Sequence, residues 1–290
     1  MAKKKIKVYK IVIGCVCLFC GLMCLMPLLY MLATSLSGRD AIAMGKVAFW
    51  PVDFTFDNYV YVMKDRAFYT AFRVSVVRTA LALVVQLCLV IMASYPISLS
   101  SRRFHARGFY TWVFLIAVLF SGGLIPTYLT VLKTGIINTI WALILPGAVP
   151  LYYVILMQNF MKSIPDEISE SAAIDGAGHF RIMSQIILPL SRVSIATISL
   201  FILVGNWNAW YDGMLYINEQ VKWPLQTYLR TVVIKVDPSA NMDFESFAAR
   251  LAAEGADTAK IFIALLPILI IYPFAQKHFV KGIVLGSVKG

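Results

Sequence analysis

Six stretches of the sequence contain no Asp, Glu, Lys or Arg, and they constrain the fold more than any other feature. They are 16 to 28 residues long and cover residues 11–38, 79–101, 108–132, 134–161, 193–211 and 261–276. A helix needs about 17–25 apolar residues to cross a membrane. Five stretches meet that length, and the sixth meets it if its helix continues past Lys277. The sequence therefore predicts an all-α integral membrane bundle of six transmembrane helices.

Composition excludes the main alternatives. The chain is 60% hydrophobic and 14% charged, whereas soluble domains are about 45–50% apolar and about 25% charged. A soluble enzyme, a disordered chain and a secreted disulfide scaffold are therefore all excluded. Strands of a membrane barrel would alternate over about 10 residues, and no stretch does so. The net charge of +11 indicates basic cytoplasmic loops rather than nucleic acid binding.

Local breaks and prolines refine the helix assignment. Gly135 and Asn138, next to Lys133, indicate a turn between the third and fourth stretches. The prolines inside the stretches include Pro27, Pro96, Pro126 and Pro146. Because neighbouring segments can satisfy the backbone groups that a proline frees, we expect the helices to continue through them.

The distribution of basic residues predicts the orientation. Residues 1–10 contain five lysines next to an apolar run, which places the N-terminus inside. Alternation then gives 14 basic residues in 61 on the inside and 12 in 90 on the outside. A signal peptide is the alternative, but its apolar run would be about 7–15 residues long. We therefore expect a basic cytoplasmic N-terminus (1–10), a transmembrane domain (11–281) and a cytoplasmic tail (282–290).

The predicted inner loop 163–189 is not a simple connection. Ser163 followed by Asp166 is typical of a capping box, and Pro165 is compatible with a first helical turn. Gly176 is placed to end this helix in a left-handed conformation. A second amphipathic stretch follows and ends at residues 188–189. The loop either packs on its own bundle or docks a separate cytoplasmic protein.

The spacing within this loop resembles a known family. Glu170, Ala172, Gly176 and Ile186 followed by 188–189 match the pattern E-A-A-(three)-G-(nine)-I-x-L-P of the EAA loop in bacterial ABC importer permeases, with Ser171 in place of the first Ala. In that family the loop is a coupling helix seated in a cleft of a separate ATPase subunit. The resemblance implies these contact residues: Glu170, Ala172, Ala173, Asp175, Gly176, Ala177, Phe180, Leu188 and Pro189.

Two further segments resemble the carbohydrate-uptake branch. Residues 206–210 (NWNAW) are similar to an element of its fifth helix. The tail 286–290 (GSVKG) resembles that of maltose-type permeases, which implies that Lys289 reaches the ATPases. Residues 120–129 and 272–290 are most similar to the Gram-positive polysaccharide permeases. The resemblance thus implies a type-I importer domain over 11–281.

Polar and aromatic residues inside the predicted spans are candidates for a solute pathway. The fifth stretch carries five of them: Asn206, Trp207, Asn208, Trp210 and Tyr211. The i, i+3, i+4 spacing predicts one shared face for Trp207, Trp210 and Tyr211. An aromatic belt at the membrane surface is the alternative. Gln86, Tyr128 and Gln158 are weaker candidates, because each can instead join two helices by hydrogen bonding.

The sequence has no phosphate-binding G-x-x-x-x-G-K-[ST] motif, so we expect separate subunits to bind ATP and Mg²⁺. Its scattered histidines form no catalytic pattern, and we expect neither an enzyme nor a metal or cofactor on this chain. The resemblance implies a homologous second permease subunit, two cytoplasmic ATPase subunits, an extracellular solute-binding protein or lipoprotein, a sugar substrate and a bacterial plasma membrane. A non-sugar ABC permease, a secondary carrier and a membrane anchor remain alternatives.

Overall fold

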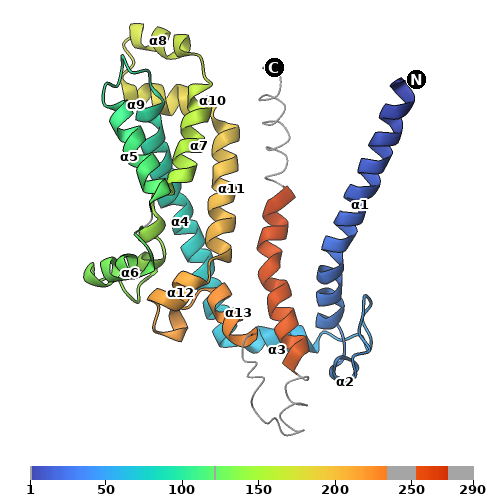
Figure 1. Ribbon diagram of the computed structural model, residues 1–290. Helices are drawn as coiled ribbons and strands as arrows, with labels where there is room; N and C mark the ends of the chain where they lie inside the picture. Colours follow the sequence, from blue (N-terminus) through green and yellow to red (C-terminus); the bar gives the residue numbers. More distant parts are fainter. Residues whose placement is uncertain (1, 121, 234–252, 274–290) are drawn as a thin grey trace. The chain divides into compact units, whose positions relative to one another are not determined.

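The computed structural model describes residues 2–120, 122–233 and 253–273, with side chains from residue 9 onward. These residues form helices and turns and contain no strand (Figure 1), which confirms the all-α class. The helices are α1 (Ala2–Ser35), α2 (Arg39–Ala43), α3 (Asp57–Lys64), α4 (Arg66–Ser98), α5 (Arg107–Leu119), α6 (Leu124–Lys133), η1 (Ile140–Leu143), η2 (Leu145–Gly147), α7 (Leu151–Lys162), α8 (Asp166–Ile174), α9 (His179–Ile182), the π-helix η3 (Met183–Ile187), α10 (Leu188–Leu190), α11 (Arg192–Asn208), α12 (Tyr211–Tyr216), η4 (Gln220–Lys222), α13 (Leu225–Val233) and a last helix, Ala253–Pro273.

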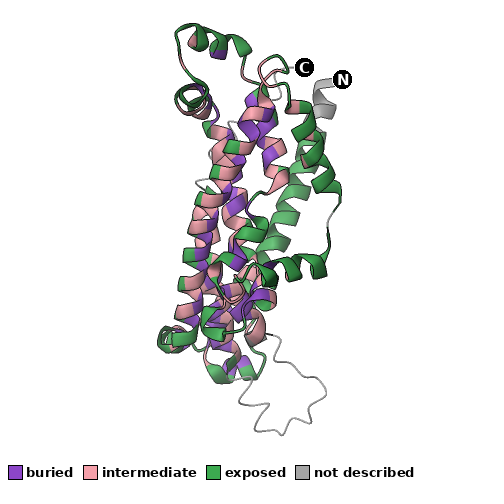
Figure 2. Ribbon diagram, turned by 90° about the vertical axis from the view of Figure 1, so that its left-hand side faces the viewer, coloured by how far each residue is buried: buried purple, intermediate pink, exposed green. Residues whose placement is uncertain are grey.

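The described helices provide three single membrane-span candidates and three bent pairs. Three helices are long and apolar enough to cross a membrane singly: Tyr9–Ser35, Arg66–Ser98 and Ala253–Pro273. Three bent pairs meet the same criterion, so the number reaches six if each pair is one span. In Figure 2 the helix that starts at the N-terminus is exposed along most of its length, as expected for an apolar helix that faces lipid or another subunit.

The third and fourth spans differ from the prediction. The third divides into α5 and α6, and Gly123 before α6 has a φ of +85°, which no right-handed helix contains. The fourth begins as the short turns η1 and η2, and only Leu151–Lys162 is regular α-helix. Continuation through Pro146 was therefore wrong, because a proline lacks the amide hydrogen and its ring blocks the preceding turn. Pro27 and Pro96 do lie inside helices, as predicted.

The chain divides into two compact units, of which the first comprises Met1–Tyr69 and Leu229–Leu266. Here the buried Asn58 amide donates hydrogen bonds to the carbonyls of Ser35 (3.1 Å) and Ser37 (3.0 Å). Asp65 caps α4 by accepting from the backbone of its first turn, and its carboxylate lies 2.9 Å from Lys260 Nζ. These contacts join α1, α3, the start of α4 and the last helix.

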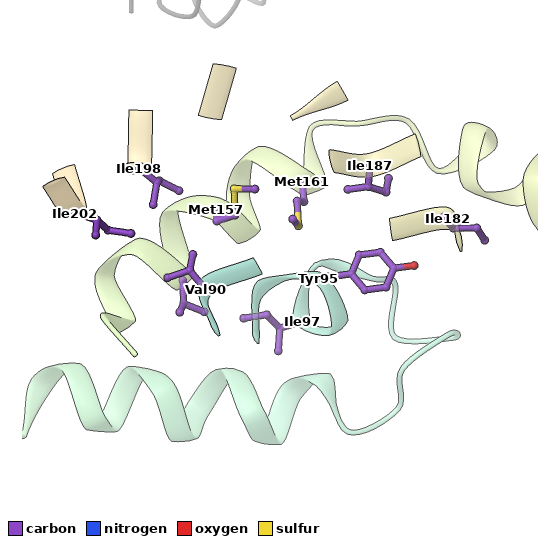
Figure 3. Packing of buried hydrophobic residues seen from close by; sticks show 10 residues of the cluster. Val90, Tyr95, Ile97, Met157, Met161, Ile182, Ile187, Ile198 and Ile202 are labelled. Atoms are coloured by element: carbon purple, nitrogen blue, oxygen red, sulfur yellow. The ribbon is translucent and has the colours of Figure 1, made fainter. Parts of the chain in front are cut away.

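The second unit comprises Thr70–Tyr228 and Pro267–Gly290, and it contains both candidate sites. Its core is drawn from α4, α7 and α11, and it also takes in two residues of the inner loop, Ile182 and Ile187 (Figure 3). Gln158 on α7 donates to the carbonyl of Ile97 on α4 at 3.1 Å. The inner loop is thus anchored on the same core that holds the spans together. The domain boundaries at residues 10, 281 and 282 stay a prediction.

Candidate functional site

The candidate coupling segment is the inner loop, residues 163–189, and its first element is α8. This helix begins two residues later than a capping box at Ser163 would place it. Pro165 is the N-cap, and Asp166 and Glu167 occupy the first turn, where negative charge is favourable. Ser163 instead ends α7, and its hydroxyl donates to the carbonyl of Phe160 at 2.7 Å. The predicted capping box is therefore wrong, because Ser163 is the C-cap of α7 and Pro165 takes the N-cap position of α8.

The end of α8 confirms the predicted role of Gly176. Its φ is +82°, and the two hydrogen bonds of a Schellman motif surround it: Gly176 N–H to Ala173 O (3.1 Å) and Ala177 N–H to Ala172 O (2.9 Å). A Cβ added at Gly176 would meet nothing within 4 Å. Backbone conformation, rather than space, therefore selects glycine here.

The rest of the segment is anchored by a wide turn. The π-helix Met183–Ile187 follows α9, and a π-turn brings residues five apart onto one side. Ile182 and Ile187 are both buried in the core of the second unit. Leu188 packs against the same core, while Pro189 is exposed. The segment is thus held from one side only.

The opposite side of the segment is exposed. Ile174 at the end of α8 is 86% exposed and Phe180 on α9 is 77% exposed. Ala173 and Asp175 are exposed as well, whereas Ala172 and Ala177 pack against the core. Large apolar residues that extend so far into solvent often mark a protein contact.

Glu170 has an intrachain partner that the sequence did not indicate. Its carboxylate lies 3.3 Å from Arg103 in the loop between α4 and α5, and the Glu170 side chain remains 59% exposed. An apolar hollow of about 400 Å³ lies beside this pair and is lined by Arg103, Phe104, His179 and Phe180, among others. The exposed apolar surface therefore extends from α9 to the α4–α5 loop.

The second candidate site lies at the end of α11. This helix stops at Asn208, because Ala209 is extended (φ −70°, ψ 123°), and α12 begins at Tyr211. The predicted shared face of Trp207, Trp210 and Tyr211 is therefore wrong, since the last two lie beyond the end of the helix. The rings of Trp210 and Tyr211 instead meet edge to face at 5.5 Å.

The break sorts the candidate pathway residues into two groups. The amide of Asn206 donates to Gln86 Oε1 (3.1 Å) and to the carbonyl of Ile202 (2.9 Å). Trp207 is 6% exposed and meets the ring of Phe72 edge to face. Asn208 and Tyr211, in contrast, are exposed and flank the break.

The two remaining candidates also make interhelical contacts. Tyr128 on α6 stacks on Tyr216 of α12 with ring centroids 6.2 Å apart. The side-chain amide of Gln158 donates one hydrogen bond to the carbonyl of Ile97, as described above. Both arrangements agree with a role in joining helices.

The structure adds a charged pair to this site. Arg78 of α4 is 2% exposed and forms an ion pair with Asp212 of α12. Sequence reasoning missed it, yet a signal was present. Arg78 immediately precedes the charge-free stretch 79–101, and Asp212 immediately follows the stretch 193–211.

The sequence of this chain matches the profile of a known protein family. The sequence profile of the family described as binding-protein-dependent transport system inner membrane component matches residues 67–284. The chain belongs to this family. It is therefore a membrane-embedded component of a transport system.

Individual relatives are similar in sequence to this permease along nearly its whole length. It is 41% identical to protein LplC of Bacillus subtilis (strain 168) over 270 residues, which cover 93% of this chain and 91% of LplC. It is 37% identical to the polygalacturonan/rhamnogalacturonan transport system permease protein YtcP of the same organism, over 93% of this chain and 94% of YtcP.

One solved structure shares the fold of this permease closely. It is a bacterial ABC transporter involved in the import of the acidic polysaccharide alginate. The TM-score is 0.85 at 27% identity, and the match covers 94% of this chain and 97% of the other.

The expected role of Lys289 is not addressed by this geometry. The residue lies in 274–290, outside the described residues. Its contact with an ATPase stays a prediction.

Proposed function

We propose that this permease forms half of the membrane pathway of an ABC importer for oligosaccharides or polysaccharide fragments. The observation that carries the proposal is the segment 163–189, whose α8 and α9 expose Ile174 and Phe180 while Ile182 and Ile187 anchor it in the core. A rigidly held segment with an exposed apolar face is suited to transmit motion between a partner and the spans.

The partner of this segment is a pair of separate ATPase subunits that bind ATP and Mg²⁺. Closure of the ATPases on ATP would push on α8, and the anchored π-turn would carry the displacement to α4, α7 and α11. Support comes from the EAA spacing and from the Schellman turn at Gly176, which fixes the angle between α8 and α9. In this proposal, this chain transmits the motion of the ATPases and forms the pathway, and it performs no catalysis.

The remaining assembly follows from the same proposal. A homologous second permease completes the pathway, and a solute-binding protein or lipoprotein delivers the solute from outside. Both termini of this permease are cytoplasmic. The lysines of residues 1–10 support that orientation. The family description names dependence on a binding protein, which supports the delivery step.

A saccharide is the proposed solute because YtcP and the alginate transporter are both named for polysaccharides. Two side chains flanking the break are suited to a sugar. Asn208 offers amide donors and acceptors for hydroxyls, and Tyr211 offers a ring face and a phenol. Both are exposed.

The test has two parts. The affinity-tagged permease, expressed with its candidate ATPase, should retain it in detergent, and the reconstituted complex should import a labelled galacturonate oligomer only with ATP and the binding protein. Replacement of the phosphate-loop lysine of the ATPase should abolish import. Retention without import of any saccharide, together with import of a peptide or a metal ion, would refute the sugar assignment and leave the coupling assignment intact. No retention would refute coupling.

A further inference from the structure

Arg78 is an unusual residue for its position. It lies in α4, one of the three helices that can span a membrane singly, and it is 2% exposed. A buried charge within a span is costly, and such residues mark functional positions by default. Its partners therefore indicate what it does.

The guanidinium of Arg78 joins three segments of the second unit. Nη1 donates to the carbonyl of Ala209 (3.3 Å) and to Asp212 Oδ1 (3.2 Å). Nη2 donates to the carbonyl of Leu143 in η1 (3.4 Å) and to Asp212 Oδ2. A planar fork of donors can make such contacts at once, whereas an ammonium group cannot reproduce their geometry.

The contact with Ala209 falls on the break itself. The last carbonyls of a helix lack partners within the helix, and a cation near them is favourable. The next carbonyl, that of Trp210, accepts a hydrogen bond from the hydroxyl of Thr227 at 2.9 Å. Both backbone carbonyls of the break are therefore held by side chains from other helices.

Two more residues of α4 hold the same region. Ser75 Oγ accepts the Leu225 N–H at the start of α13 (2.7 Å), and Gln86 Oε1 accepts the amide of Asn206 (3.1 Å). With Arg78 they lie three and eight residues apart along the sequence, which places them on one face of the helix. This face of α4 thus carries three polar side chains that make hydrogen bonds to residues between 206 and 225, and Arg78 is the middle one of the three along the helix.

We propose that Arg78 is a positioning residue for saccharide selection, because its clamp on Ala209 and Asp212 sets where Asn208 and Tyr211 face the pathway. The inference rests on the proposed function. Arg78 itself touches no sugar, since its nearly complete burial leaves it no free surface. Its effect on selection passes through the backbone of the break.

The experiment compares uptake of two probes, a galacturonate trisaccharide and an alginate trisaccharide, by reconstituted complexes that share one preparation of binding protein. Any change in their uptake ratio then arises in the permease. Arg78→Gln should change this ratio by about tenfold, equivalent to about 1.4 kcal/mol, while ATPase retention stays near wild type. The matched control is Arg73→Gln, because Arg73 is an exposed cation on the same helix and should leave the ratio unchanged.

Two further variants separate positioning from stability. Arg78→Lys keeps the charge beside Asp212 but loses the fork, so it should shift the ratio in the same direction. Arg78→Gln combined with Asp212→Asn removes the unpaired charge, so it should restore any lost assembly but not the ratio.

An unchanged uptake ratio in assembled Arg78 variants would overturn the inference and leave the proposed function standing. Failure of both single Arg78 variants to assemble would assign Arg78 a purely structural role, and it would also overturn the inference. If the wild-type complex imports no saccharide at all, the proposed function fails instead.

Discussion

Replacing Gly176 by valine should weaken the attachment of the ATPase, and the size of the effect can be worked from the backbone. Gly176 has a φ of +82°. A residue with a Cβ pays roughly 1–2 kcal/mol in this left-handed region, and a β-branched residue is a genuine outlier there. A Cβ would meet nothing within 4 Å, so steric contact adds nothing. We expect a cost of about 2 kcal/mol for the α8–α9 turn, or roughly 30-fold in an equilibrium that requires it.

Gly178, two residues further on, provides the matched control. Its φ of −72° and ψ of 164° lie in the extended region that valine favours, and a Cβ there also meets nothing within 4 Å. Gly178→Val should therefore be near neutral. Gly176→Asn should be mild as well, because asparagine tolerates the left-handed conformation.

The assay is retention of the ATPase by each variant in detergent, at equal amounts of inserted permease. Hydrogen exchange at the amides of residues 176 and 177 provides a second measurement, since those amides make the Schellman bonds. Exchange should accelerate in Gly176→Val alone. Equal losses for valine at 176 and 178, or a Gly176→Asn variant as impaired as Gly176→Val, would refute the conformational argument.

The other predictions concern charge, packing and the tail. Glu170→Lys should uncouple transport without loss of inserted protein, because an exposed ion pair contributes only about 0–1 kcal/mol to stability. Adding Arg103→Glu restores the intrachain pair with its charges exchanged. Full recovery of uptake in this double variant would show that Glu170 serves only that pair. Gly213→Ala should lower the Tm of the purified permease, because its Cβ would lie 2.1 Å from Thr227 Oγ1, and overpacking costs about 1–3 kcal/mol; Thr227→Ala in the same chain should recover part of the loss, and no change in Tm for the single variant would contradict the packing. Deletion of residues 286–290 should lower ATP hydrolysis by the complex while insertion stays normal, and unchanged hydrolysis would rule out a role for the tail.

The sequence predicted the spans well where helices are continuous and poorly where they break. Charge-free length located the three single spans and the three bent pairs, because burying charge in lipid is costly regardless of detail. The break at Pro146 was missed because whether a proline interrupts a span depends on its neighbours. Pro27 and Pro96 lie inside long helices, whereas Pro146 lies in the turn η2.

The coupling turn was predictable for a local reason, and the end of α11 was not. Gly176 carries its own conformational signal, so the sequence alone located the left-handed residue. The end of α11 at Asn208 has no proline or glycine beside it. Side chains from two other helices hold this end. Arg78 of α4 donates to the carbonyl of Ala209, and Thr227 of α13 donates to the carbonyl of Trp210. Contacts of this kind depend on the tertiary fold, so helical periodicity carried the predicted helix too far.

The direction in which the coupling segment presents its exposed side chains depends on the number of residues in the π-turn Met183–Ile187. A π-turn holds one residue more than the corresponding α-turn, and each residue of an α-helix turns the chain by about 100°. With one residue fewer, Ile182 and Ile187 could not both enter the core, and Phe180 would rotate with α9 away from its present direction. The face offered to the partner is therefore set by a local count of residues, independently of which side chains that face carries.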